Sequence, residues 1–188
     1  METIEQQFQQ FYENIKLTKA QRKDAMDKYD GVCRKLHDCF YPNTSYTGNT
    51  KLLIGSYGKH TSIRPARDVD VVFIMPPEKF SQYDDNTSNK QSQLLQDIKE
   101  ILKEKYPITP IKAFGKVVVL EFSETRHNIE VVPAWENSDG TFCIPNSENG
   151  GSWEIVRYRE EIKSVLDSDS RTGKTKFLIR VVKKWANT

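Results

Sequence analysis

The residues best suited to chemistry in this chain are a Gly-Ser pair and two aspartates that follow it. Gly55 and Ser56 end a short apolar stretch, Asp68 comes twelve residues after Ser56, and Asp70 opens a second apolar stretch. Alternate residues of a strand point to the same side, so the two carboxylates would face one way together. Neighbouring carboxylates repel unless a cation separates them, usually a divalent metal. A Gly-Ser turn offers N–H groups and a hydroxyl to phosphate oxygens, so the pattern predicts phosphoryl or nucleotidyl transfer.

A third acid, Glu130, stands between apolar residues in the segment Asn128–Pro133. Burying an unpaired carboxylate is costly, so an acid inside an apolar strand is unusual. If this strand lies beside the one that begins after Asp68, the three acids form one cluster. Three carboxylates can hold two Mg²⁺ ions about 3.5–4 Å apart, which stabilises both the attacking and the leaving oxygen. The alternative is a solvated strand face, and the Gly-Ser and Asp-x-Asp pattern upstream favours the cluster.

Two cations near the C-terminal end of the sequence are also candidates for a functional role. Arg180 and Lys183 are three residues apart, so both can reach one anion from a single helix face. A polyphosphate needs such neutralisation. The alternative is the solvated face of an amphipathic helix, which is the commoner arrangement for an isolated pair.

Apolar periodicity predicts the elements that must position these residues, and Thr18 with Gln21 predicts a capping box. Proline is expected to end two of the strands, at Pro76 and at Pro133. Helices are predicted over Ile4–Ile15, from Thr18 to Phe40, and over Gln91–Tyr106, Trp153–Leu166 and Lys174–Trp185; strands over Leu52–Ile54, Val69–Met75, Ile111–Phe114, Lys116–Phe122 and Asn128–Val132; loops over Pro42–Thr50, Gln82–Asn89 (a mobile surface loop) and Glu136–Gly151.

Composition narrows the class of protein. The chain has 188 residues, of which 37% are hydrophobic and 29% charged, which suits one domain with a sizeable core. The formal net charge of +2 is too small to predict a stable nucleic-acid partner. The sequence shows neither an apolar run of membrane-spanning length nor a signal-peptide pattern. Its three cysteines form no C-x-x-C pair, so we expect a cytoplasmic protein without a membrane partner.

Taken together, these motifs resemble the nucleotidyltransferase superfamily that includes DNA polymerase beta. Within it, they are most similar to the cyclic GMP–AMP synthase-like and oligoadenylate synthase-like branch, in particular its bacterial enzymes of anti-phage signalling. The resemblance implies a mixed α/β fold, with a central twisted sheet flanked by helices, N-terminal helices and a C-terminal basic helix. It rests on Gly55-Ser56 with Thr61 and Asp68–Asp70, on Ile129–Ala134, and on Arg180–Trp185, which is similar to the family's Arg-x-x-Lys-x-Trp helix.

The resemblance also implies a role for each acid and for the Gly-Ser pair. Gly55 and Ser56 would bind the β- and γ-phosphates of the donor nucleotide, ATP or GTP. Asp68 and Asp70 would coordinate two Mg²⁺ ions, for which Mn²⁺ is an alternative. Glu130 would bind the catalytic metal and help to deprotonate the attacking ribose hydroxyl.

For the basic helix, the resemblance implies that Lys183, together with Arg180, binds the triphosphate. The reaction would be in-line attack of a 2′- or 3′-hydroxyl on the donor α-phosphate, with release of pyrophosphate. The product would be a cyclic or short linear oligonucleotide that serves as a second messenger. A regulatory protein partner is a further expectation.

Two departures from the family pattern keep alternatives open. The third acid is usually Asp, whereas Glu130 is one methylene longer, and family members usually continue past the basic helix into a helical bundle. We therefore expect residues 1–188 to form a single catalytic domain, as the N-terminal lobe of a longer protein. The first alternative function is nucleotide addition to RNA or to protein. The second is a nucleotide-binding domain without catalytic activity.

Overall fold

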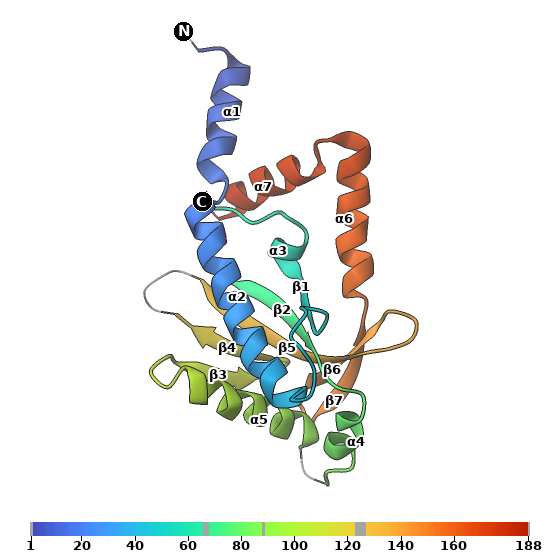
Figure 1. Cartoon of the computed structure of the whole chain (residues 1–188). Coiled ribbons are helices and arrows are strands. Elements are labelled where there is room, and N and C mark those ends of the chain that lie inside the picture. Colours follow the sequence, from blue (N-terminus) through green and yellow to red (C-terminus); the bar gives the residue numbers. More distant parts are fainter. Residues whose placement is uncertain (1, 66–67, 88, 123–126, 188) are drawn as a thin grey trace.

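A computed structural model describes residues 2–65, 68–87, 89–122 and 127–187, and within them a seven-stranded mixed sheet carries helices (Figure 1). The helices are α1 (Ile4–Ile15), α2 (Lys19–Phe40), α3 (Gly55–Gly58), α4 (Lys79–Asp84), α5 (Lys90–Lys105), α6 (Tyr158–Thr172) and α7 (Thr175–Ala186). The strands are β1 (Lys51–Leu53), β2 (Val69–Ile74), β3 (Ile111–Phe114), β4 (Val117–Glu121), β5 (Asn128–Glu136), β6 (Phe142–Asn146) and β7 (Ser152–Val156).

The sheet has the order β1-β2-β5-β4-β3, and β6 pairs with the end of β5 and with β7. The pairing of β2 with β5 is parallel, whereas the other pairings are antiparallel. Residues Val69 and Ile129 are opposite each other in the parallel pair, which places Asp70 opposite Glu130. The prediction that the third-acid strand lies beside the strand of the two aspartates is confirmed.

Alternate residues of β2 and β5 pack against different layers. Val69, Val71 and Phe73 belong to the main core, which also contains buried residues of α2 and α5. Val72 belongs to a smaller cluster on the opposite face, which includes residues from β6, β7 and the start of α6. Because Asp70 has the same parity as Val72, the aspartates face away from the main core.

Both N-terminal helices begin where their caps predict. Thr18 accepts a hydrogen bond from the Gln21 N–H, and Gln21 accepts one from the Thr18 N–H, so the predicted capping box of α2 is confirmed. Thr3 and Gln6 form the same arrangement at α1. The helices predicted over Gln91–Tyr106 and Lys174–Trp185 are confirmed as α5 and α7, within one residue at each end.

The prediction that Pro133 ends a strand is wrong, because β5 continues to Glu136. Proline has no N–H to donate, and it is tolerated in a strand only where none is needed. Pro133 falls in the gap between the β4 pairing, which ends at Val131, and the β6 pairing, which begins at Trp135.

The prediction of one long loop over Glu136–Gly151 is also wrong, because this segment contains β6 and two tight turns. The polar residues lie in the turns: Asp139 accepts hydrogen bonds from the N–H and hydroxyl of Thr141, at 3.0 and 2.7 Å. The predicted helix over Trp153–Leu166 begins later, at Tyr158, because Ser152–Val156 pairs with β6 as β7.

The segment predicted as a mobile loop over Gln82–Asn89 overlaps the short helix α4, and residue 88 lies outside the described residues. Tyr83 anchors this helix, because its side chain is buried and its hydroxyl donates to Asp97 Oδ2 at 3.1 Å. Two apolar residues in six are too few to show a helical period, so the pattern missed it.

The outer surfaces of α1 and α7 are apolar and exposed. The exposed fractions are 52% for Phe8, 59% for Leu178 and 77% for Trp185. Apolar residues at helical spacing usually form a buried face, and here that face is open. The two helices pack against each other through Phe8 and Tyr12, which contact Phe177. Among the described residues, none of the helices is long and apolar enough to cross a membrane.

The main core makes one prediction about stability. Phe73 is fully buried in β2 and contacts Phe40 of α2 at a ring distance of 5.9 Å. We expect Phe73→Ala to lower the free energy of unfolding by about 3–5 kcal/mol, since it leaves a cavity that neighbouring side chains fill only in part. Urea denaturation measures the change. The control is Ile108→Ala, at a residue 94% exposed, and similar losses in both variants would contradict the assignment of the core.

Candidate functional site

The turn after β1 brings Gly55 against Asp70. Gly55 has a φ of +54°, in the left-handed region, and a Cβ atom at this position would lie 1.9 Å from Asp70 Oδ2. The backbone N–H of Ser56 donates to the same Asp70 carboxylate. Only glycine allows the carboxylate to approach the turn this closely. The structure therefore joins the Gly-Ser pair directly to the second aspartate of the Asp-x-Asp motif.

The three acids lie at the N-terminal ends of two neighbouring interior strands of the sheet. Asp70 and Glu130 are opposite each other on β2 and β5, and Asp68 precedes β2 by one residue. Asp68 Oδ1 accepts a hydrogen bond of 3.0 Å from Asn128, the first residue of β5. The predicted cluster thus has two members on neighbouring parallel strands and the third directly before one of them.

Burial, together with repulsion from neighbouring carboxylates, raises the affinity of Asp70 and Glu130 for protons. Burial raises the pKa of Glu130 to about 7, with further contributions from the charges of Asp68 and Asp70. Burial also raises the pKa of Asp70, and the charge of Asp68 adds to this shift. Since an excess of negative charge has gathered here, a bound cation would stabilise the ionised form of these acids.

Over the described part of the chain, no three His, Cys, Asp or Glu side chains stand close enough to hold a metal ion as they are placed. Asp70 accepts from Ser56 and Asp68 accepts from Asn128, so the carboxylates turn toward separate donors. The donor set is nevertheless one of hard carboxylate oxygens, which suits Mg²⁺ or Mn²⁺. The residues fit such an ion by chemistry and by their place at the same end of two neighbouring strands.

A cavity of about 270 Å³ lies between the Gly-Ser turn and α7. Two residues predicted to bind nucleotide, Ser56 and Lys183, are on its walls. Lys183 is half-buried and donates to Thr61 Oγ1 at 3.4 Å. Desolvation lowers the pKa of Lys183, as do the charges of Lys59 and Arg180, whereas the charge of Asp70 raises it. With Lys184 and Arg64 also in the lining, the cavity has an electropositive wall. The lining residues are Ser56, Tyr57, Ser62, Ile63, Arg64, Pro65, Lys183, Lys184 and Asn187.

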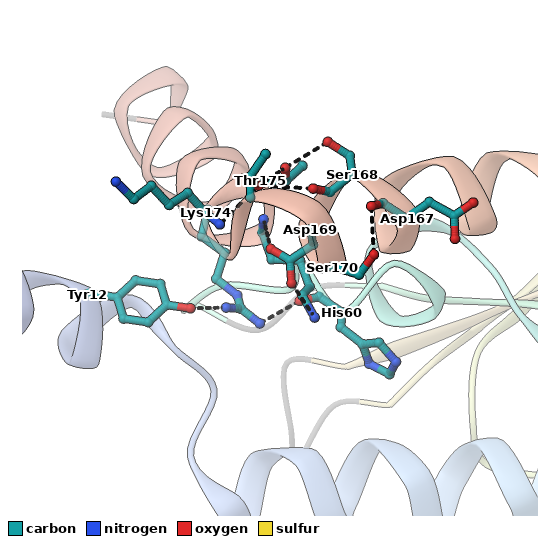
Figure 2. A network of polar contacts seen from close by, with 11 residues as sticks. Tyr12, His60, Asp167, Ser168, Asp169, Ser170, Lys174 and Thr175 are labelled. Atoms are coloured by element: carbon teal, nitrogen blue, oxygen red, sulfur yellow. Dashed lines mark hydrogen bonds and ion pairs between the residues drawn. The ribbon is translucent and has the colours of Figure 1, made fainter.

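Arg180 is on the same helix as Lys183, but its guanidinium is engaged elsewhere. One Nη donates to the hydroxyl of Tyr12 and the other to the carbonyl of His60 (Figure 2). The structure therefore brings together six of the seven predicted site residues around the turn and the acid strands. It places the charged end of Arg180 between α1 and the segment that follows α3.

Sequence reasoning missed Asn128 and Ser62. Asn128 faces Asp68 because Val69 is paired with Ile129, so the signal exists only once the strand register is known. The Ser62 hydroxyl lies 3.2 Å from the Ser56 hydroxyl, and the spacing of the two serines in the sequence does not predict this contact.

Gly55→Ala tests the contact between the turn and Asp70. Gly140 is a matched control, because its φ is +80° and an added Cβ would meet nothing within 4 Å. We expect Gly140→Ala to cost about 1 kcal/mol for the left-handed backbone alone. We expect Gly55→Ala to cost about 1–3 kcal/mol more, since the Asp70 carboxylate must also move. Equal losses in urea denaturation would contradict the contact.

Glu130→Gln tests the raised pKa of Glu130. The folded state binds this proton more tightly than the unfolded state does, so wild-type stability falls as the pH rises from 4.5 through about 7. The variant lacks this loss. Without divalent metal, we expect it to match the wild type below pH 4.5 and to exceed it above pH 7.

Above pH 7, the free energy of unfolding of Glu130→Gln should exceed that of the wild type by about 1–2 kcal/mol. Solvent screening reduces this difference because Glu130 is only half-buried. Thermal unfolding over this pH range measures it. Glu148→Gln, at an exposed position, is the control. Parallel stability profiles of Glu130→Gln and the wild type would rule out the raised pKa.

Comparison with known proteins places this geometry in a family. A model of the Second Messenger Oligonucleotide or Dinucleotide Synthetase (SMODS) domain matches residues 1–168. The chain is similar to a probable cyclic nucleotide synthase of Bacillus cereus, with 23% identity over 201 aligned residues. That alignment covers 86% of this chain and 61% of the relative, so the chain spans less than two thirds of the relative's length.

Solved structures share the fold at low sequence identity. The Vibrio cholerae DncV cyclic AMP–GMP synthase, in complex with the linear intermediate 5′ pppA(3′,5′)pG, superposes with a TM-score of 0.74 and 12% identity. It covers 93% of this chain and 64% of the DncV chain. E. coli CdnC with ATP superposes with a TM-score of 0.67 and 18% identity, over 96% of this chain and 56% of the CdnC chain.

These matches confirm the predicted fold class and the resemblance to cyclic GMP–AMP synthase-like nucleotidyltransferases. The family model covers most of the chain, including the Gly-Ser turn, the Asp-x-Asp motif and the strand of Glu130. The chain therefore belongs to the SMODS family of nucleotidyltransferases.

Proposed function

We propose that this chain is the catalytic domain of an Mg²⁺-dependent enzyme that joins nucleoside triphosphates into a cyclic or short linear oligonucleotide messenger. The observation that carries the proposal is the pairing of Asp70 with Glu130 on adjacent parallel strands, beside the Gly-Ser turn. Family membership supports the same reaction class. Among the similar structures, DncV is in complex with a non-hydrolysable GTP and CdnC with ATP.

In this proposal Asp68, Asp70 and Glu130 hold the divalent ions. Bound there, Mg²⁺ would stabilise charge on the attacking and leaving oxygens. Glu130 accepts the proton of the attacking 2′- or 3′-hydroxyl, a general-base role open to an ionised carboxylate. The oxygen of that hydroxyl forms a bond to the donor α-phosphorus while the bond to pyrophosphate breaks.

The phosphates of the donor would occupy the cavity between the turn and α7. The Ser56 hydroxyl lies on one wall, and the Lys183 ammonium is a cation on the other. Lys183 has a lowered pKa because it is partly desolvated among other cations, and an anion would relieve that repulsion. The electropositive wall therefore supports a polyphosphate as the ligand.

The decisive experiment incubates the full-length protein that contains this chain with all four nucleoside triphosphates and Mg²⁺. Pyrophosphate and a phosphatase-resistant or short oligonucleotide product support the proposal. Label transferred instead to RNA or to a protein would favour the alternative acceptors. Nucleotide binding without metal-dependent turnover would favour an inactive binding domain. A regulatory protein partner, a role in anti-phage defence and a cytoplasmic location stay predictions.

Substitution of the aspartates tests the assigned site. We expect Asp68→Asn and Asp70→Asn each to lower turnover at least about 100-fold, because charge stabilisation at the reacting phosphate is lost. Asp85→Asn, at the exposed end of α4, is the control and should leave turnover unchanged. Turnover that survives in the Asp70 variant would exclude Asp70 as a metal ligand.

A further inference from the structure

Arg180 joins two segments that lie far apart in the sequence. Its guanidinium donates to the Tyr12 hydroxyl on α1 and to the His60 carbonyl in the segment after α3 (Figure 2). Its Nε is buried and has no hydrogen-bond partner among the described residues. Two of the five N–H groups of the guanidinium are directed at protein oxygens outside the cavity, and Arg180 is not among the residues that line the cavity. Arg180 is thus built into the wall of the site rather than aimed into the cavity.

The His60 carbonyl is a point where the backbone needs support. His60 has a φ of +55°, a left-handed conformation that costs free energy for any residue with a side chain. The conformation reverses the chain after α3, so that the His60 N–H donates to Tyr57 O at 3.1 Å and the Thr61 N–H to Ser56 O at 2.8 Å. A charged donor on the His60 carbonyl stabilises this reversal.

The reversal sets the residues that touch the proposed phosphate-binding groups. Thr61 is buried, and its hydroxyl accepts from Lys183 at 3.4 Å. The Ser62 hydroxyl lies 3.2 Å from the Ser56 hydroxyl, and Ser62 also lines the cavity. A shift of the His60 carbonyl would therefore move the partners of both Lys183 and Ser56.

Helix α1 fixes the other end of the same segment. The Arg64 N–H donates to Ile15 O at 2.7 Å, and Ile63 forms a bridge with Lys16. The Tyr12 ring lies 4.7 Å from that of Phe177, which attaches α1 to α7. Residues 60–64 are thus held by the end of α1 and, through Arg180, by Tyr12.

We propose that Tyr12 and Arg180 are positioning residues that hold residues 60–64 as the wall of the nucleotide cavity, and that they do not themselves bind the phosphates. The proposal rests on the proposed nucleotide-binding function. It differs from the role that the family resemblance implies for Arg180, which is direct contact with the triphosphate. Tyr12 helps to distinguish the two roles, because its hydroxyl touches Arg180 and Tyr12 is not among the residues that line the cavity.

The experiment uses two variants. Tyr12→Phe removes the hydroxyl and keeps the ring against Phe177. Arg180→Lys keeps the positive charge but loses the planar guanidinium that donates to Tyr12 and His60 at once. Tyr46→Phe is the matched control, since it removes a hydroxyl that bonds Asp30 at 2.9 Å, away from the cavity. The first readout is hydrogen exchange of the Thr61 and Arg64 amides without nucleotide. The second is the Kd for a non-hydrolysable ATP analogue.

We expect both variants to speed exchange of these amides and to raise the Kd about 5-fold or more, with the control unchanged. The Kd of the double variant should be no higher than that of the single variant with the higher Kd, because both substitutions break the same connection from Tyr12 through Arg180 to His60. Unchanged exchange and Kd in Tyr12→Phe, together with a raised Kd in Arg180→Lys, would overturn the proposal in favour of direct phosphate contact. If the wild type binds no nucleotide, the proposed function fails, and the positioning role for a nucleotide site fails with it; faster exchange would then show a structural connection alone.

Discussion

The rest of this structure depends on the parallel register that sets Asp70 opposite Glu130. Two carboxylates in neighbouring strands repel each other, and partial burial makes the repulsion stronger. The pair persists because the other faces of β2 and β5 are fixed in the main core by α2 and α5. Hydrophobic packing on one side of the sheet thus maintains an electrostatically unfavourable arrangement on the other. Asn128 and the Ser56 N–H offset part of this repulsion by donating to the aspartates.

Much of the fold follows from local signals, because these depend on neighbours in sequence. The Thr18–Gln21 capping box and the apolar period of α5 located their helices within one residue. The region around Glu136–Gly151 was predicted wrongly because its polar turn residues mask a short apolar strand between them. The prediction at Pro133 was wrong for a related reason. A strand tolerates proline where no neighbouring strand needs its N–H as a donor, and the sequence alone does not show which strands pair at that position.

The candidate site likewise contains residues that sequence patterns predict and contacts that they do not predict. The alternation of Asp68 and Asp70 after a Gly-Ser turn predicts a site there, and Glu130 is added because an acid in an apolar strand is unusual. The pairing of β2 with β5 then places Asp70 opposite Glu130. Contacts that depend on tertiary placement were invisible, such as the hydrogen bond from Asn128 to Asp68. Arg180 shows the limit most clearly. Its spacing from Lys183 suggests a shared ligand, whereas its actual partners lie on α1 and after α3, and no period in the sequence connects those segments.

The two-sided packing of β2 also bears on how such a protein can diverge. Residues of one parity, such as Val71 and Phe73, constrain one another through the interior. Asp70, of the other parity, makes its contacts with the turn and with β5. Substitutions among the core residues of β2 can therefore respond to selection for folding, while those at Asp70 and its contacts respond to selection for reaction and substrate. Lineages can exchange one chemistry for another on an inherited scaffold, because the two sets of residues mutate in large part independently.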